Sequence, residues 1–169
     1  ARRDELLNQL PNLKSDIPTY EAYSEMTIDD IFSQKALRES THKNIFTLES
    51  TYFENVNGEK FNSQPLPPKS QFSPIQSIIS RDFTGDGTSD LLIGDNFFAS
   101  DTKQGRYDAG YGLLLTGNGK GSFTSVPIEE SGFMVRGEVR DMKIFRGPDS
   151  EFYVFIARND APPLVYRLE

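Results

Sequence analysis

Oxygen-bearing residues recur at regular spacing between positions 82 and 90 of the sequence. If Asp82 is counted as position 1 of a loop, side-chain oxygens follow at positions 3, 5 and 9, and a threonine at position 7 can add its carbonyl oxygen. Gly87 stands at position 6, where a chain that wraps around an ion must turn sharply. Hard cations such as Ca²⁺ take oxygen ligands at this spacing, and a divalent cation would relieve the repulsion among three carboxylates. The predicted Ca²⁺ ligands are Asp82, Thr84, Asp86, Thr88 and Asp90.

The residues on either side of this loop predict strands rather than helices. A helix–loop–helix calcium site carries a bidentate glutamate at position 12, and that position is Ile93 here. The run 91–94 is short and apolar, as in a buried strand, and three isoleucines between positions 75 and 79 indicate another strand upstream. A plain tight hairpin is the alternative, because Asp, Gly, Thr and Ser all favour turns. Thr84 stands where Asp or Asn would bind calcium better, so we expect modest affinity.

Positions 1–42 predict a segment of short helices. Leucines between positions 6 and 13 follow a helical spacing that Pro11 interrupts, so the first helix should end near residue 9 or 10. Thr27 has the side chain of an N-cap, and the acids Asp29 and Asp30 follow it in the first turn of another helix. Residues 33–39, which begin with serine, predict one more.

From residue 43 onward the pattern is that of short antiparallel strands. Apolar and polar residues alternate between positions 46 and 54, and Asn57-Gly58 is a strong hairpin signal. Polar and glycine-rich connections then separate a series of short apolar runs. Further strands are expected within residues 111–117, 122–128, 139–145, 151–157 and 164–168.

Two stretches of this β region resemble each other in the same order. A turn followed by Phe and Pro occurs around Phe61 and again around Phe123, and Asp82 aligns with Asp141 at a similar offset. A period of about 60 residues with four short strands in each repeat is typical of propeller blades. We therefore expect a mainly β fold, namely a partial β-propeller of about two antiparallel blades at 43–112 and 113–169, preceded by a helical segment at 1–42.

The acidic loop also resembles a known family. DFTGDGTSDLLIG, residues 82–94, looks like the DFNGDGxxDLLVG-type loop of FG-GAP/VCBS repeats, the blades of integrin α-subunit heads. The run 96–145 is similar to the C-terminal part of large Bacteroidetes VCBS-repeat proteins that carry an ASPIC/UnbV segment, and residues 3–32 to the segment before those blades. The resemblance implies propeller blades, Ca²⁺ at the five residues named above, and an exported protein that is extracellular, periplasmic or on the outer-membrane surface.

Composition argues against several classes of function. The net charge of −7 disfavours a nucleic-acid surface, and no apolar run is long enough to span a membrane. The absence of cysteine excludes disulfides and thiolate metal sites. His42 is the only histidine and stands among polar residues, so no nucleophile with its base is recognisable. We expect a non-enzymatic protein.

The long polar connection between residues 96 and 112 is a candidate binding loop. Long loops in compact domains are often functional, and Tyr and Arg anchor many interfaces. The alternative is structural, with Arg106 paired to Asp108 and the tyrosines packed on a neighbouring blade. The candidate binding residues are Phe97, Phe98, Arg106, Tyr107, Asp108 and Tyr111.

Together these patterns favour a calcium-stabilised repeat module that binds a protein or a glycan. One alternative is a fragment of a polysaccharide-acting hydrolase with a structural calcium and loop aromatics that stack on sugar rings. Another is a structural spacer without a ligand. Two blades do not close a propeller, so we expect the uncovered sheet faces to be covered by the N-terminal helices, by the remaining blades of a longer parent chain or by self-association.

Overall fold

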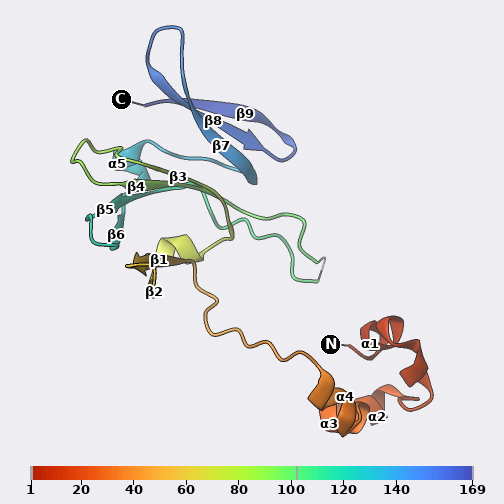
Figure 1. Ribbon diagram of the computed structural model, residues 1–169. Coiled ribbons are helices and arrows are strands. Elements are labelled where there is room, and N and C mark those ends of the chain that lie inside the picture. The colour runs from red at the N-terminus through yellow and green to blue at the C-terminus, as the bar shows by residue number, and fades with distance from the viewer. Residues whose placement is uncertain (1, 102, 169) are drawn as a thin grey trace. The chain divides into compact units, whose positions relative to one another are not determined.

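The chain forms two compact units, Ala1–Phe46 and Thr47–Glu169. A computed structural model describes residues 2–101 and 103–168 (Figure 1). The first unit therefore ends at residue 46 rather than at the predicted residue 42. Across the described residues, no helix has both the length and the hydropathy needed to cross a membrane.

The first unit consists of the short helices that the sequence predicts. The first helix ends at Gln9, directly before Leu10 and Pro11. The Thr27 amide donates to Asp30 Oδ2 at 2.8 Å and forms the reciprocal cap of the third α-helix, while Ser33 Oγ accepts from the Ala36 amide at 3.2 Å. These side chains satisfy backbone amides that a helix start leaves without partners. The elements are α1 (Arg3–Gln9), the 3₁₀ helix η1 (Pro11–Lys14), α2 (Tyr20–Glu25), α3 (Ile28–Ile31) and α4 (Gln34–Glu39).

The second unit consists of three small antiparallel sheets, and the chain is mainly β with short N-terminal helices, as expected. The first sheet pairs β1 with β2, the middle sheet has the order β3-β4-β5-β6, and the last sheet has the order β7-β8-β9. No closed propeller is formed by the described strands. The elements are β1 (Thr51–Val56), β2 (Lys60–Pro65), η2 (Pro68–Gln71), β3 (Ile75–Arg81), β4 (Asp90–Asp95), β5 (Leu113–Gly117), β6 (Phe123–Ser125), α5 (Ile128–Ser131), β7 (Val139–Arg146), β8 (Phe152–Arg158) and β9 (Ala161–Arg167).

The first strand begins later than the alternating pattern predicts. It starts at Thr51, and the apolar residues before it remain outside the sheet. Ile45, Phe46 and Leu48 are 78%, 91% and 90% exposed. Alternation alone does not make a strand, because a strand needs a neighbour to pair with, and β2 ends opposite Thr51.

The middle sheet is packed on both faces. On one face, Leu92 belongs to a core with Met142, Val154 and Ile156 of the last sheet. On the other face, a second cluster joins residues of the middle sheet to Leu66 and Tyr52 near the first sheet. Because successive side chains of a strand point to opposite faces, the apolar run in β4 supplies both cores.

Two strands, β3 and β7, resemble each other in structure, at a spacing that differs from one of the predicted alignments. β3 and β7 each carry a β-bulge, at Ile75/Ser77 and at Val139/Asp141, so the two bulges are offset by 64 in sequence number (139 − 75). Asp141 pairs with Ala157 inside the last sheet, whereas Asp82 follows the end of β3. The predicted equivalence of Asp82 and Asp141 is therefore wrong.

The predicted blade boundary at 112/113 also needs correction. It falls within the middle sheet, because β4 pairs directly with β5. The sheets change between β6 and β7, where α5 follows the last strand of the middle sheet. The sequence places a long polar loop at 96–112, but this loop connects two strands of one sheet.

Candidate functional site

The acidic loop connects β3 to β4, as the sequence predicts. Arg81 and Asp90 are opposite each other in the antiparallel β3/β4 ladder, at the base of the loop. The run 91–94 lies in β4 rather than in a helix. Gly85 and Gly87 have φ values of 76° and 84°, a left-handed conformation that L side chains rarely adopt. The two glycines allow the loop to fold back on its own carboxylates.

Asp90 is the buried acceptor at the base of this loop. The residue is 0% exposed. One carboxylate oxygen accepts from the amides of Phe83 and Thr84 at 2.9 and 3.1 Å, and the other accepts from the Gly117 amide at 2.9 Å. Gly117 belongs to β5, so this carboxylate joins the loop to the neighbouring strand of the middle sheet.

Asp82 binds backbone amides at the start of the loop. Its Oδ1 accepts from Gly85 at 2.6 Å and from Asp86 at 3.2 Å, and its Oδ2 accepts from Gly87 at 2.9 Å. Backbone amides can therefore occupy the acceptor positions of this carboxylate without a cation. The loop amides therefore supply part of the stabilisation of the Asp82 carboxylate that the sequence analysis attributed to Ca²⁺.

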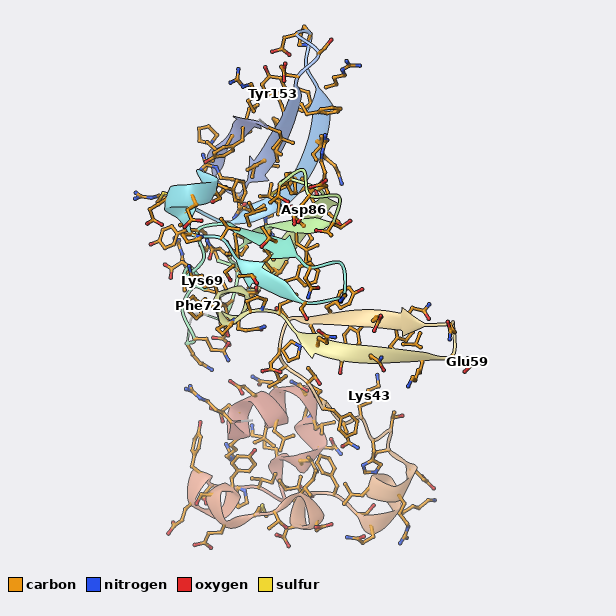
Figure 2. The ribbon with its side chains drawn as sticks, turned by 90° about the vertical axis from the view of Figure 1, so that its left-hand side faces the viewer. Lys43, Glu59, Lys69, Phe72, Asp86 and Tyr153 are labelled. Carbon is orange, nitrogen blue, oxygen red and sulfur yellow. The ribbon has the colours of Figure 1, made fainter. Side chains whose placement is uncertain are left out.

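Asp86 is the exposed acid at the turn of the loop (Figure 2). Its Oδ1 accepts from the Thr88 hydroxyl at 2.6 Å and from the Thr88 amide at 2.7 Å, and these bonds lower the pKa of Asp86. The Thr88 hydroxyl also lies 3.0 Å from the Gly117 carbonyl. Thr84 Oγ1 lies 3.5 Å from Asp82 Oδ1.

The donor set of the loop suits a hard cation, because it consists of carboxylate, hydroxyl and carbonyl oxygens. Within residues 2–101 and 103–168, however, the structure has no group of three or more His, Cys, Asp or Glu side chains arranged to hold a metal ion. The described carboxylates bind amides instead. A cation would have to share these oxygens through their remaining lone pairs, and the calcium site remains a prediction.

The candidate binding loop is braced by a small antiparallel bridge. Phe97 and Tyr107 exchange two backbone hydrogen bonds of 2.9 Å. The Arg106 guanidinium lies 4.9 Å from the centre of the Phe98 ring, and no ion pair joins it to Asp108 among the described residues. The predicted Arg106–Asp108 pair is therefore not formed.

The tyrosines of this loop are open to solvent. Tyr107 and Tyr111 are 43% and 46% exposed, and Asp108 is exposed as well. An aromatic ring and a hydroxyl on an exposed loop can contact a protein or a sugar. The structure thus places Phe97, Phe98, Arg106 and Tyr107 together on one braced segment, whereas Tyr111 lies nearer the start of β5.

The base of the binding loop holds a buried polar cluster that sequence reasoning missed. Asn96 is 1% exposed and has a φ of 80°. Its amide nitrogen donates to the carbonyls of Gly110 and Gly137 at 2.9 Å, and its oxygen accepts from the Gly110 amide at 2.9 Å. Asp95 beside it accepts from the Gly112 amide at 3.3 Å, and burial raises the pKa of Asp95. The sequence signal was an Asp-Asn pair at the end of an apolar strand.

A cavity of about 660 Å³ lies between the middle and last sheets. Its walls include the aromatic rings of Phe133, Phe152 and Tyr166, and the Arg81 guanidinium lies 4.3 Å from the centre of the Phe152 ring. Three acids and two arginines from distant parts of the chain also line it. The residues that line the cavity span positions 81 to 168, and this separation in sequence leaves no local signal from which to predict it.

Comparison of the chain with protein-family models, with curated proteins and with solved structures found no match.

Proposed function

We propose that this chain is a non-enzymatic β-repeat module of an exported bacterial protein, in which the acidic loop takes Ca²⁺ and the 96–112 loop contacts a protein or glycan. The observation that carries the proposal is the position of the acidic loop, at the first turn of a four-stranded antiparallel sheet. Its acids at positions 1 and 9 bind backbone amides of the loop and of β5. Hydrogen bonds of this kind stabilise the sheet, which is the role expected of a structural loop.

The arrangement of strands supports a section of FG-GAP/VCBS-type propeller. The middle sheet is a four-stranded antiparallel meander with the acidic loop at its first turn, which is the make-up of one propeller blade. On this proposal, the first sheet is the outer part of a preceding blade and the last sheet is the beginning of the next. Sheets that pack face to face in sequence order agree with this assignment.

Calcium binding is proposed for Asp82, Thr84, Asp86, Thr88 and Asp90. When bound, the ion would supply positive charge and oxygen-directed bonds that hold the hairpin. Asp86 is the acid best placed to respond to it, because it is exposed and its hydrogen bonds come from threonines of the same loop. Binding would compete with the Thr88 hydroxyl for this carboxylate.

Ligand binding is proposed for the braced loop that carries Phe97, Phe98, Arg106, Tyr107 and Tyr111. The exposed rings offer apolar faces, and the Arg106 side chain adds a positive charge beside Phe98. Sugar rings and protein side chains both pack on such rings. An exported location fits a ligand of this kind and is part of the proposal.

Two measurements test the proposed function. Thermal unfolding should shift upward when Ca²⁺ is added and downward in EDTA, and Asp86→Ala should abolish the difference. Binding to a glycan array and to candidate proteins should be saturable and should weaken at least tenfold in Tyr107→Ala. Tyr20→Ala, a change at an exposed tyrosine of the helical unit, is the matched control. No binding would favour a spacer, and turnover of a bound glycan would contradict the non-enzymatic proposal.

A further inference from the structure

The last sheet has an uncovered apolar face. Lys143, Phe155 and Val165 are cross-strand neighbours on β7, β8 and β9. Phe155 and Val165 are 40% and 54% exposed, whereas the other face of the same sheet contributes Val154 and Ile156 to the core at 0% exposure. We call this face, with the members Lys143, Phe155 and Val165, the trailing face.

The same three positions are covered in the middle sheet. Ile79 pairs with Leu92, and Leu92 pairs with Leu114. Ile79 lies two positions beyond the second residue of the β3 bulge, as Lys143 does in β7. The Ile79, Leu92 and Leu114 side chains pack against the last sheet. The trailing face is therefore the repeat equivalent of a face that already receives another sheet.

Within the second unit, the first sheet leaves the opposite half of this contact uncovered. Phe53 and Phe61 are 56% and 67% exposed, and we call these two residues the leading face. β1 and β2 match β5 and β6 at a constant offset of 62 in sequence number (115 − 53 and 123 − 61). Phe53 pairs with Ser63 as Leu115 pairs with Ser125, and Phe61 pairs with Asn55 as Phe123 pairs with Gly117.

The equivalents of the leading face are also covered in the middle sheet. Leu115 is 0% exposed, and Phe123 packs beside it. The Phe123 ring meets the Tyr52 ring of the first sheet edge to face, with centroids 5.6 Å apart. At the same offset, Tyr52 corresponds to Leu114, and Leu114 holds the position in the middle sheet that Val165 holds in the last sheet. The leading and trailing faces are thus the two halves of one sheet-to-sheet contact.

We infer that the trailing face of one copy of this chain binds the leading face of a second copy. Phe61 of a second copy would lie against Val165, as Phe123 lies against Tyr52 within the chain. The two faces differ, so the contact is heterologous and leads to rings or open chains of copies rather than to a closed two-fold dimer. The contact continues an interface that the chain already forms twice, and it requires neither Ca²⁺ nor a ligand.

Sedimentation of the full chain tests this inference with one variant at each face. Val165→Asp should block the trailing face and Phe61→Asp the leading face, because each places a charge in an apolar contact. The wild type should gain mass with concentration, and each variant alone should lose association at least tenfold. An equimolar mixture of the two variants should form a heterodimer, because one intact leading face and one intact trailing face remain.

Phe72→Asp is the matched control, since Phe72 is 59% exposed and belongs to neither face. It should associate as the wild type does. Each variant should also melt as the wild-type monomer does, because all three side chains are exposed. A wild type that stays monomeric up to about 1 mM, the weak limit of specific association, overturns the inference. Association that the mixture fails to restore overturns the head-to-tail arrangement.

Discussion

Asp90→Ala tests whether the acidic loop is held mainly by its own hydrogen bonds. The substitution removes both carboxylate oxygens from a residue that is 0% exposed. Three backbone amides, those of Phe83, Thr84 and Gly117, then lose their acceptor. The methyl group of alanine cannot replace them, and the site sits between two strands of the middle sheet.

The expected cost follows from these three donors. An unsatisfied buried donor costs about 1–3 kcal/mol, and the lower end applies here because the donors are only partly buried. We therefore expect a loss of about 3 kcal/mol in the free energy of unfolding, which for a unit of this size lowers the melting temperature by about 10 °C. Asp90→Asn keeps one oxygen and should fall between alanine and wild type.

Urea and thermal unfolding in EDTA measure this effect without a contribution from any cation. Asp86→Ala is the control, because Asp86 is exposed and accepts hydrogen bonds from threonines of its own loop. It should destabilise the chain much less than Asp90→Ala under these conditions. If the two alanine variants were equally stable in EDTA, the argument that Asp90 holds the sheet through amides would be refuted.

Three further predictions concern the second unit and the capped helix α3. Gly110→Ala should destabilise by about 1–3 kcal/mol in urea, because a Cβ there would lie 2.0 Å from Asp95 Oδ2; an unchanged midpoint would contradict this. Burial raises the pKa of Asp95 above its unfolded value, so its stabilising contribution is present at low pH and lost as pH rises through the folded pKa. Asp95→Asn should therefore raise the melting temperature at neutral pH, with a gain that shrinks toward about pH 4, whereas a gain independent of pH would exclude this cause. The backbone amide and hydroxyl of Thr27 lower the pKa of Asp30, so this cap is stabilising above the unfolded pKa of about 3.9 and is lost as pH falls through the lower folded value. The protection factors of the α3 amides should fall over that range, and they should already be low at neutral pH in Asp30→Asn.

Local sequence signals predicted the elements well. Thr27 and Ser33 identified two helix starts, and the apolar run before Gly94 identified β4, because capping and strand burial depend on neighbouring residues. The Asn57-Gly58 pair also predicted a hairpin correctly, because this turn type requires positive φ at both residues and both have it.

Strand register, sheet boundaries and cavities depend on residues that are distant in sequence, so local patterns do not predict them. The alignment of Asp82 with Asp141 matched residue types but ignored the bulge, which places Asp141 inside β7. The blade boundary at 112/113 failed because strand pairing across a long loop leaves no local pattern. The cavity lined by Phe133 and Phe152 brings together segments that no motif connects.

The acidic loop explains why a motif of this kind does not by itself identify a cation site. The same spacing that suits an ion also lets Asp82 and Asp90 collect amides from a tight turn, and the two glycines with positive φ serve either purpose. The burial of Asp90 and the exposure of Asp86 divide these roles between two residues. Stability in EDTA should therefore depend on Asp90, and the response to added Ca²⁺ should depend on Asp86, so the structural and ion-binding roles of the loop can be lost separately.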